Sequence, residues 1–438
     1  MHRLLSLSVV RASLAATFAV AAASAAGAAD AVPTFAKDVA PIFYRSCVSC
    51  HRPGQIAPMS LLTYDTARPW ARSIKERVTK REMPPWHIDQ TVGIKEYKDD
   101  PSLSDAEIQT VARWVDGGAP MGSASDLPKM PTFASDDEWS IGTPDLVVSA
   151  PKYDVKANMA DWFGSFYVDS GLNEDRWIKS IEVKPGDKRV VHHTIVYSLQ
   201  DDEEELKMYV PERENDGFNR AAGTRLIEYA IGNLGDVYDE GTARLIKAGA
   251  KLHFSAHYHA IAEDVTEQTR VGIVFYPKGY QPKYIIQNKL VGAGNLDIPP
   301  GEADVRHDAY FTLKKPAKLL LFQPHMHYRG RAMALEAIYP DRRVELLSYV
   351  PRFDVMWQIT YAYKNPPVFP AGTTLHQTSW HDNSVSNKRN PDPTNWVGSG
   401  NRTIDEMSIG HIDFIYLSDE DYAAELRAQQ TRNNTQQQ

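Results

Sequence analysis

Two adjacent histidines interrupt a stretch of the chain that otherwise has the composition of a buried strand. The stretch is VVHHTIVY (190–197), and the histidines are His192 and His193. Neighbouring side chains on a regular strand point to opposite faces, so each face would bury an imidazole without an obvious partner. A bulge or twist would let both rings converge, as would bonding through Nδ1 in one ring and Nε2 in the other. The pair is therefore a candidate for metal ligation.

Two further stretches carry histidines at a spacing that suits a strand. HFSAHYH holds His253, His257 and His259, and PHMH holds His325 and His327. Alternate residues share one face of a strand, so a His-x-His pair can clamp a single metal ion. Buried imidazoles need partners, and one metal ion satisfies several of them together. The joint occurrence of these motifs, more than any one of them, predicts metal binding.

The identity of the metal depends on whether a sulfur ligand joins the histidines. Three imidazoles alone would suit zinc or copper. A thioether beside two imidazoles favours copper, because soft sulfur stabilises Cu(I). Met407 in RTIDEMSIGHIDF (402–414) is the candidate thioether, although alone it fits ordinary core packing.

A third kind of motif, CVSCH, has the spacing of covalent c-type haem attachment. Cys47 and Cys50 would add to the haem vinyl groups, and His51 would supply the proximal iron ligand. The alternatives are a zinc site, a redox dithiol or a disulfide, but zinc would need further ligands that a second cysteine pair does not supply. These are the chain's two cysteines, so none remains to cross-link other parts. A haem also favours copper over zinc, because zinc has no redox chemistry for an electron carrier to serve.

The distal haem ligand is expected to be Met83, which lies in the proline-stiffened turn REMPPW. Met59 and His87 are rival ligands. A haem held by histidine and methionine is six-coordinate and suited to electron transfer.

Helices are expected on both sides of these haem ligands. FAKDVAPIFYRSC (35–47) leads into the haem motif, and residues 103–120 form the second helix. The second helix begins with a capping box of Ser104 and Glu107 and ends at two glycines. Residues 33–122 resemble small class I cytochromes c, which implies a small all-α haem domain.

The N-terminus and the overall charge indicate where the chain works. Arg3 and Arg11 precede an Ala-rich apolar run, so residues 1–29 are expected to be a cleaved export signal, with an uncleaved anchor as the alternative. No later run of about 20 apolar residues follows, so we expect an exported, soluble, periplasmic bacterial protein without stable membrane insertion. A net charge of −8 gives no basic field for nucleic acid.

The remainder of the chain changes to a period of two, which predicts many short strands. Helical stretches are few, with residues 202–212 and 241–249 as candidates. We therefore predict a small all-α cytochrome c domain followed by two all-β sandwich, jelly-roll-like domains. The expected boundaries are signal peptide 1–29, haem domain 33–122, linker 123–145, first β-domain 146–287, second β-domain 288–424 and disordered tail 425–438.

From about residue 144 to 420, the chain resembles the copper type II ascorbate-dependent monooxygenases, the family of peptidylglycine α-hydroxylating monooxygenase and dopamine β-monooxygenase. The ordered motifs HH, HYH, PPGE (299–302), HxH and EM carry this resemblance. It implies two copper ions, one per β-domain, facing each other across a solvent-filled cleft. The electron-transfer copper would be held by His192, His193 and His257, and the oxygen-binding catalytic copper by His325, His327 and Met407.

Two positions depart from this family. Where the peptide-hydroxylating members hold the substrate carboxylate with an arginine and a tyrosine, this chain has Gln323 and His411. The copper chemistry is therefore carried over and the peptide substrate is not. His253 and His259 remain rivals of His257 or outer partners of the copper site.

The resemblance implies hydroxylation of an activated C–H bond in a small organic molecule by O2. The cofactors would be two copper ions and one haem c, and the haem would relay electrons from an external donor, either a redox protein or a small reductant. The alternatives are an electron-transfer or copper-handling protein that hydroxylates nothing, and an oxidase in which the haem accepts electrons.

Overall fold

The computed structural model describes residues 31–133, 138–199, 224–230, 235–400 and 402–436. The expected signal peptide (1–29), the helical candidate 202–212 and part of the expected linker lie outside these residues. Within the described ranges, no helix combines the length and the apolar character needed to cross a membrane.

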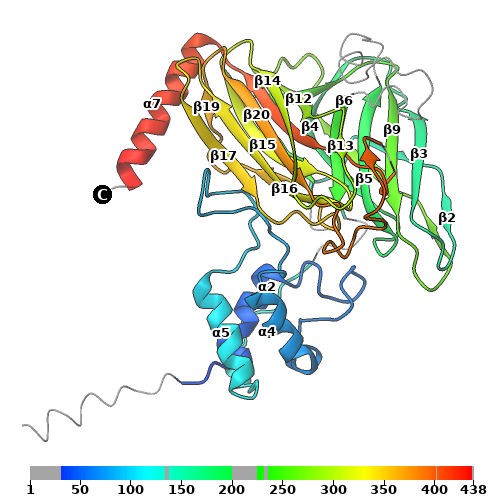
Figure 1. Cartoon of the computed structure of the whole chain (residues 1–438), viewed down its shortest axis with the longest axis vertical. Helices are drawn as coiled ribbons and strands as arrows, with labels where there is room; N and C mark the ends of the chain where they lie inside the picture. The colour runs from blue at the N-terminus through cyan, green and yellow to red at the C-terminus, as the bar shows by residue number, and fades with distance from the viewer. Residues whose placement is uncertain (1–30, 134–137, 200–223, 231–234, 401, 437–438) are drawn as a thin grey trace, which may run out of the picture.

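The helices are short and lie mainly near the N-terminus, as Figure 1 shows in blue and cyan. They are η2 (Phe35–Val39), α2 (Ala40–Ser46), α3 (Tyr64–Ala67), η3 (Arg68–Trp70), α4 (Ala71–Thr79), α5 (Asp105–Asp116), η4 (Ala124–Asp126) and α7 (Asp419–Gln436). The predicted capping box of α5 is confirmed, because the Ser104 side chain accepts from the Glu107 amide and the Glu107 side chain accepts from the Ser104 amide.

The other secondary-structure elements of the described chain are strands. They are β1 (Leu146–Ser149), β2 (Tyr153–Val155), β3 (Trp162–Asp169), β4 (Arg176–Lys184), β5 (Val191–Leu199), β6 (Thr224–Ala230), β7 (Asp236–Val237), β8 (Thr242–Ile246), β9 (Lys251–Tyr258), β10 (Val265–Glu267), β11 (Arg270–Phe275), β12 (Tyr284–Gly292), β13 (Asp297–Ile298), β14 (Val305–Thr312), β15 (Ala317–His325), β16 (Gly330–Ile338), β17 (Val344–Val350), β18 (Tyr361–Ala362), β19 (Val368–Phe369), β20 (Thr374–His381), β21 (Val397–Gly398) and β22 (Ile409–Tyr416).

One long sheet runs through the β-rich part. Its ten strands follow the order β1-β11-β4-β8-β12-β22-β15-β18, with β7 and β19 paired at the side. Two four-stranded sheets, β3-β9-β5-β6 and β14-β20-β16-β17, complete the main layers. The first apolar core contains side chains of β1, β4 and β11 together with β5, β6 and β9, and the second contains side chains of β15 and β22 together with β16 and β20. Each four-stranded sheet therefore packs over one half of the long sheet.

The predicted fold class is wrong. The described chain is mostly β-sheet with few helices, and a separate all-α cytochrome c domain is not evident in it. The two expected β-sandwiches are also not separate, because β8 and β12 pair in parallel and join both halves into one sheet. The expected boundary between residues 287 and 288 falls inside β12.

The residues between α4 and α5 connect the helices with the β-sheets. Residues 84–100, here called the connecting segment, reach the β-sheets beside β17 (Figure 1). Amides of Asp89, Ile94 and Lys98 donate to backbone carbonyls of β17 and β18 over 2.8–2.9 Å. Ile88 and Tyr97 are buried in the second β core.

Two local predictions are also corrected. Residues 241–249 were expected to be helical, but they contain β8, which has a strand neighbour on each side. Pairing with β4 and β12 outweighs the local helix propensity. The tail expected to be disordered from residue 425 instead belongs to α7, whose first turn carries three acidic residues. Residues 437–438 lie outside the described chain.

Candidate functional site

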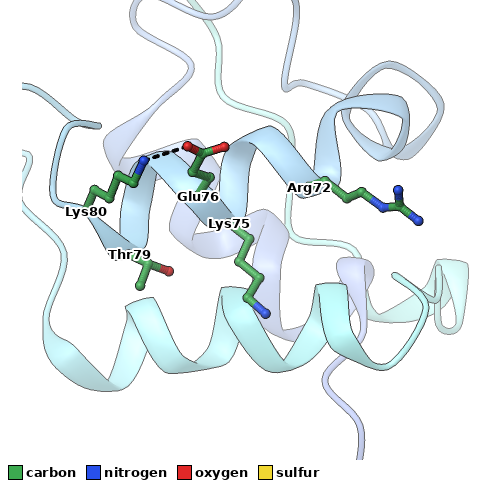
Figure 2. Close-up of a pocket in the computed structure, with 5 residues that line it drawn as sticks. All are labelled: Arg72, Lys75, Glu76, Thr79 and Lys80. Carbon is green, nitrogen blue, oxygen red and sulfur yellow. Dashed lines mark hydrogen bonds and ion pairs between the residues drawn. The ribbon is translucent and has the colours of Figure 1, made fainter.

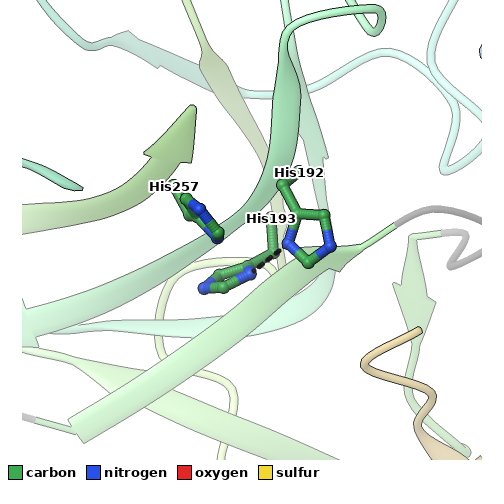
Figure 3. Close-up of side chains that lie close together, drawn as sticks. All are labelled: His192, His193 and His257. Atoms are coloured by element: carbon green, nitrogen blue, oxygen red, sulfur yellow. Dashed lines mark hydrogen bonds between the residues drawn. The ribbon is translucent and has the colours of Figure 1, made fainter. Parts of the chain in front are cut away.

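His192, His193 and His257 lie together and are here called the first histidine set. Their ligand atoms all lie within 4.8 Å of one another, and all three residues are buried. Figure 3 shows the rings turned toward one another, with His192 and His193 on β5 and His257 on β9. The pairing of β5 with β9 shifts register between Val191 and His193, so the predicted bulge is present. The bulge explains how adjacent side chains reach one side of the strand.

Hydrogen bonds indicate which ring nitrogens of the first histidine set would face a metal. The Nδ1 atoms of His192 and His193 are 3.0 Å apart. The Nε2 atom of His257 is 3.1 Å from Oδ2 of Asp161, which leaves Nδ1 of His257 available as a ligand. Two ligands with bonds of about 2.1 Å can be at most about 4.2 Å apart across one ion. The ligand atoms of the first histidine set lie within 4.8 Å of one another, so a small side-chain rotation would bring all three rings onto one metal ion.

The burial of this set favours neutral imidazoles, the form that binds metal. Burial lowers the pKa of His192 to about 4, and it lowers the pKa of His193 well below the usual range. Both rings are therefore uncharged at neutral pH.

The rival histidines lie outside this group. The exposed His259 places Nδ1 2.8 Å from Oδ1 of Asp161, so that one carboxylate connects it to His257. His253 bonds Oγ of Ser165 through Nε2 at 2.7 Å and stacks on Tyr167. Asp161 was not anticipated from the sequence, because an isolated aspartate carries no signal of its proximity to a distant histidine.

His325, His327 and Met407 are here called the second ligand set, and they lie at or just beyond the ends of two paired strands. β15 and β22 are antiparallel, with His325 opposite Ile409 and Gln323 opposite His411. His327 and Met407 lie two residues beyond the last paired residues of these strands. Both histidines are buried, and Met407 is partly buried.

Each histidine of the second ligand set has a hydrogen bond at Nδ1. Nδ1 of His325 is 3.1 Å from the side-chain oxygen of Gln358, and Nδ1 of His327 is 3.1 Å from the carbonyl oxygen of Asp405. Both acceptors fix the proton on Nδ1, so Nε2 is the available ligand atom. Burial lowers the pKa of His325 to about 3 and that of His327 to about 4, which again favours the neutral rings.

The two sets adjoin each other. The rings of His193 and His325 have centroids 6.3 Å apart and perpendicular planes, so they pack edge to face. The resemblance implied a solvent-filled cleft between the two copper ions. At these two side chains the sets are in contact instead.

A buried polar network surrounds Gln323, one of the two positions at which the chain differs from the copper monooxygenases that it resembles. The Gln323 side chain accepts from Arg225 at 2.6 Å and donates to Glu228 at 2.6 Å. His411 is 6.1 Å from His325 between ring centroids. Gln323 is therefore already engaged with its own protein neighbours.

The haem motif has suitable local geometry. The His51 amide donates to the Cys47 carbonyl at 2.9 Å, so one helical turn separates the first thiol from the imidazole. Nδ1 of His51 is 3.2 Å from the Met59 carbonyl, which leaves Nε2 for iron. Cys47 and Cys50 are both free thiols. These donors fit a covalently bound haem.

Of the expected distal ligands, Met83 and His87 flank the start of the connecting segment. Met83 is partly buried after α4, and the His87 amide donates to the Tyr361 hydroxyl at 3.3 Å. Met59 packs against the apolar core of the helices. The choice of Met83 stays a prediction.

A surface hollow runs along α4 (Figure 2). It is lined by Arg72, Lys75, Glu76, Thr79 and Lys80. Lys80 donates to Glu76 at 2.6 Å, and Lys75 pairs with Asp116. We assign no chemistry to this hollow, because its lining lacks histidine and sulfur ligands.

Comparisons with known proteins do not assign the chain to a family. No protein-family model matches it, and no curated protein does. Among solved structures, the VP2 subviral particle of infectious bursal disease virus is 11% identical, with a TM-score of 0.19 over 67% of this chain and 76% of that chain. The Gx strain of the same virus gives 9% identity and a TM-score of 0.19 over 66% of this chain and 76% of that chain. Scores this low carry no argument about fold or function.

Proposed function

We propose that the chain is an exported, periplasmic copper-dependent monooxygenase that hydroxylates an activated C–H bond of a small organic molecule. The observation that carries this proposal is the first histidine set, three buried imidazoles that lie beside His325 of the second ligand set, whose two histidines are oriented by hydrogen bonds at Nδ1. Substrate, O2, two electrons and two protons would yield the alcohol and water. The family resemblance supports this reaction class.

The protein's part in this reaction would be to hold neutral ligands in fixed orientations. Bound copper would supply one-electron redox chemistry and an open coordination position. Asp161 fixes the His257 ring, while Gln358 and the Asp405 carbonyl fix the His325 and His327 rings. Burial keeps water away from the imidazoles and strengthens these hydrogen bonds.

We also propose that Cys47, Cys50 and His51 hold a c-type haem through two thioether bonds and one axial bond, with Met83 as the distal ligand. This haem would receive electrons from an external one-electron donor. Attachment to the same chain replaces a diffusive encounter with a high effective concentration of electron donor.

Isotope labelling tests the reaction class. The full-length protein, loaded with copper and haem, is reduced and supplied with candidate C–H substrates under 18O2. Incorporation of one labelled oxygen atom into a product is expected. Elemental analysis should find two copper ions per chain, and finding none after reconstitution would end the proposal.

Met407→Ala tests the assignment of the second ligand set. The variant should lose turnover by several orders of magnitude while its circular dichroism remains that of the parent protein, because Met407 is only partly buried. Full activity in this variant would remove the methionine from the site.

The contact between His193 and His325 favours a second candidate, a copper and haem electron-transfer protein that hydroxylates nothing. Rings 6.3 Å apart leave little room for a substrate between them. This candidate predicts reversible haem and copper reduction without any 18O-labelled product.

A further inference from the structure

Glu406 lies where the strand ladder that carries the second ligand set ends. The pairing of β15 with β22 stops at His325 and Ile409, two residues short of His327 and Met407. The backbone amides of His327 and Met407 are therefore not part of the ladder between these two strands. Buried amides need another acceptor.

The Glu406 carboxylate supplies that acceptor. Its Oε2 accepts from the His327 amide at 3.0 Å and from the Met407 amide at 3.2 Å. Its Oε1 accepts from the Arg329 amide at 2.6 Å. The Glu406 side chain is fully buried, so water does not compete for these bonds. One carboxylate thus joins the two chain segments that carry His327 and Met407.

Neighbouring contacts strengthen the same connection. Arg329 is buried and donates to the Ile404 carbonyl at 2.9 Å and to Oδ1 of Asn383 at 2.8 Å. His381 Nε2 is 3.2 Å from the Met407 carbonyl. The loop of residues 404–407 is therefore attached to the turn after β15 at several successive points.

We infer that Glu406 is a positioning residue that holds His327 and Met407 in register, so that imidazole and thioether can bind the same metal ion. The metal part of this inference rests on the proposed function. The carboxylate clamp between the two chain segments is independent of the proposed function. Loss of the clamp would loosen the connection between Met407 and His327, because the ladder between β15 and β22 does not reach these two residues.

Glu406→Gln is the informative variant, because it keeps the size of the side chain but turns one acceptor oxygen into a donor. That donor would face a backbone N–H group. Glu267→Gln is a matched control. Glu267 is also fully buried and accepts from the Gly186 amide, the Thr269 hydroxyl and the Tyr258 hydroxyl, far from the second ligand set in sequence.

The first measurement is hydrogen exchange on the metal-free full-length protein. We expect peptides covering residues 324–330 and 405–409 to exchange at least about tenfold faster in E406Q than in the parent protein, because their amides lose an acceptor. E267Q should leave these peptides unchanged. Parent-like exchange in E406Q would overturn the clamp, whether or not the protein binds copper.

The second measurement is X-ray absorption on the Cu(I)-loaded protein. The sulfur signal expected for copper in the parent protein should be absent in E406Q. The copper affinity of the second ligand set should fall by about 10–100-fold in this variant. The first histidine set should retain its copper in both variants. A parent-like sulfur signal and affinity in E406Q would overturn the positioning role.

A shorter carboxylate covers the case in which E406Q fails to fold. Glu406→Asp keeps the carboxyl group but withdraws its oxygens by one methylene group, so the sulfur signal should again be lost. If E406D retains that signal, the inference is overturned. If the parent binds no copper at the second set, the proposed function fails, while the hydrogen-exchange result still decides the clamp.

Discussion

The ring nitrogen available to a metal in the first histidine set depends on one residue, Asp161. Its carboxylate bonds Nε2 of His257, which favours metal binding through Nδ1 and raises the basicity of that ligand. Asp161→Asn should therefore lower copper affinity at the first set by about tenfold or more. Titration against a copper chelator measures this loss. Asp264→Asn is the control, since the exposed Asp264 carboxylate bonds the nearby Ala157 amide and Lys156. Equal affinities in the two variants would contradict the role.

At the same scale, the spacing of the sequence identified the His192–His193 pair, the family resemblance added His257, and neither predicted the orientation of the rings. A pair of histidines can be recognised from spacing, because strand geometry limits where neighbouring side chains point. The choice of nitrogen depends on acceptors from distant segments, namely Asp161, Gln358 and the Asp405 carbonyl. Local spacing contains no information about those contacts.

The central strands of the ten-stranded sheet are connected by a buried ion pair. Arg244 of β8 pairs with Asp413 of β22, and Asn288 of β12, between them, donates to Asp413 at 2.6 Å. Asp413→Ala would leave a buried guanidinium without its counter-charge, so it should lower the free energy of unfolding by about 3–5 kcal/mol. Urea denaturation measures the change. Asp421→Ala removes the partly buried partner of the exposed Lys283 and should cost about 0–1 kcal/mol. Similar losses in both variants would contradict this account.

β7, at the side of the same sheet, introduces a pH dependence through Asp236. Burial raises the pKa of Asp236 to about 6, with Arg244 opposing this shift. In the unfolded chain this pKa is about 3.9. The folded state therefore binds more protons between these values, and stability falls as pH rises from about 4 to about 6. Asp236→Asn should remove this slope and raise the free energy of unfolding at pH 7 by about 1–3 kcal/mol. Urea denaturation at pH 4.5 and pH 7 tests it, and an unchanged slope would contradict it.

At the scale of elements, period-two patterns located most strands because each strand buries a face locally. β8 was mistaken for a helix, since its short run of Thr242–Ile246 has too few residues to establish a period and its strand neighbours are distant in sequence. The same long-range pairing of β8 with β12 joined two expected domains into one sheet. Sequence periodicity identifies a strand but not its neighbours.

At the scale of the whole molecule, the connecting segment links the haem motif region to the second ligand set. Trp86 packs on Tyr361 with ring centroids 4.9 Å apart, and Gln358, three residues before Tyr361, bonds the His325 ring. Nothing in the local sequence of the segment predicts this contact, because it lies about 270 positions away along the chain. The expectation of an independent helical domain failed for this reason.

Trp86→Ala should detach the connecting segment from the β-sheets. Trp86 also packs on Tyr97 at 6.1 Å, so removal of the indole leaves a gap between both tyrosines and should cost about 2–4 kcal/mol of unfolding free energy. Residues 84–100 should exchange their amides faster, and electron transfer from the proposed haem, followed at its absorption bands, should slow. Trp70→Ala is the control, since Trp70 is 43% exposed on η3. If the amides of residues 84–100 exchange at the same rate in both variants, Trp86 does not hold the connecting segment against the β-sheets.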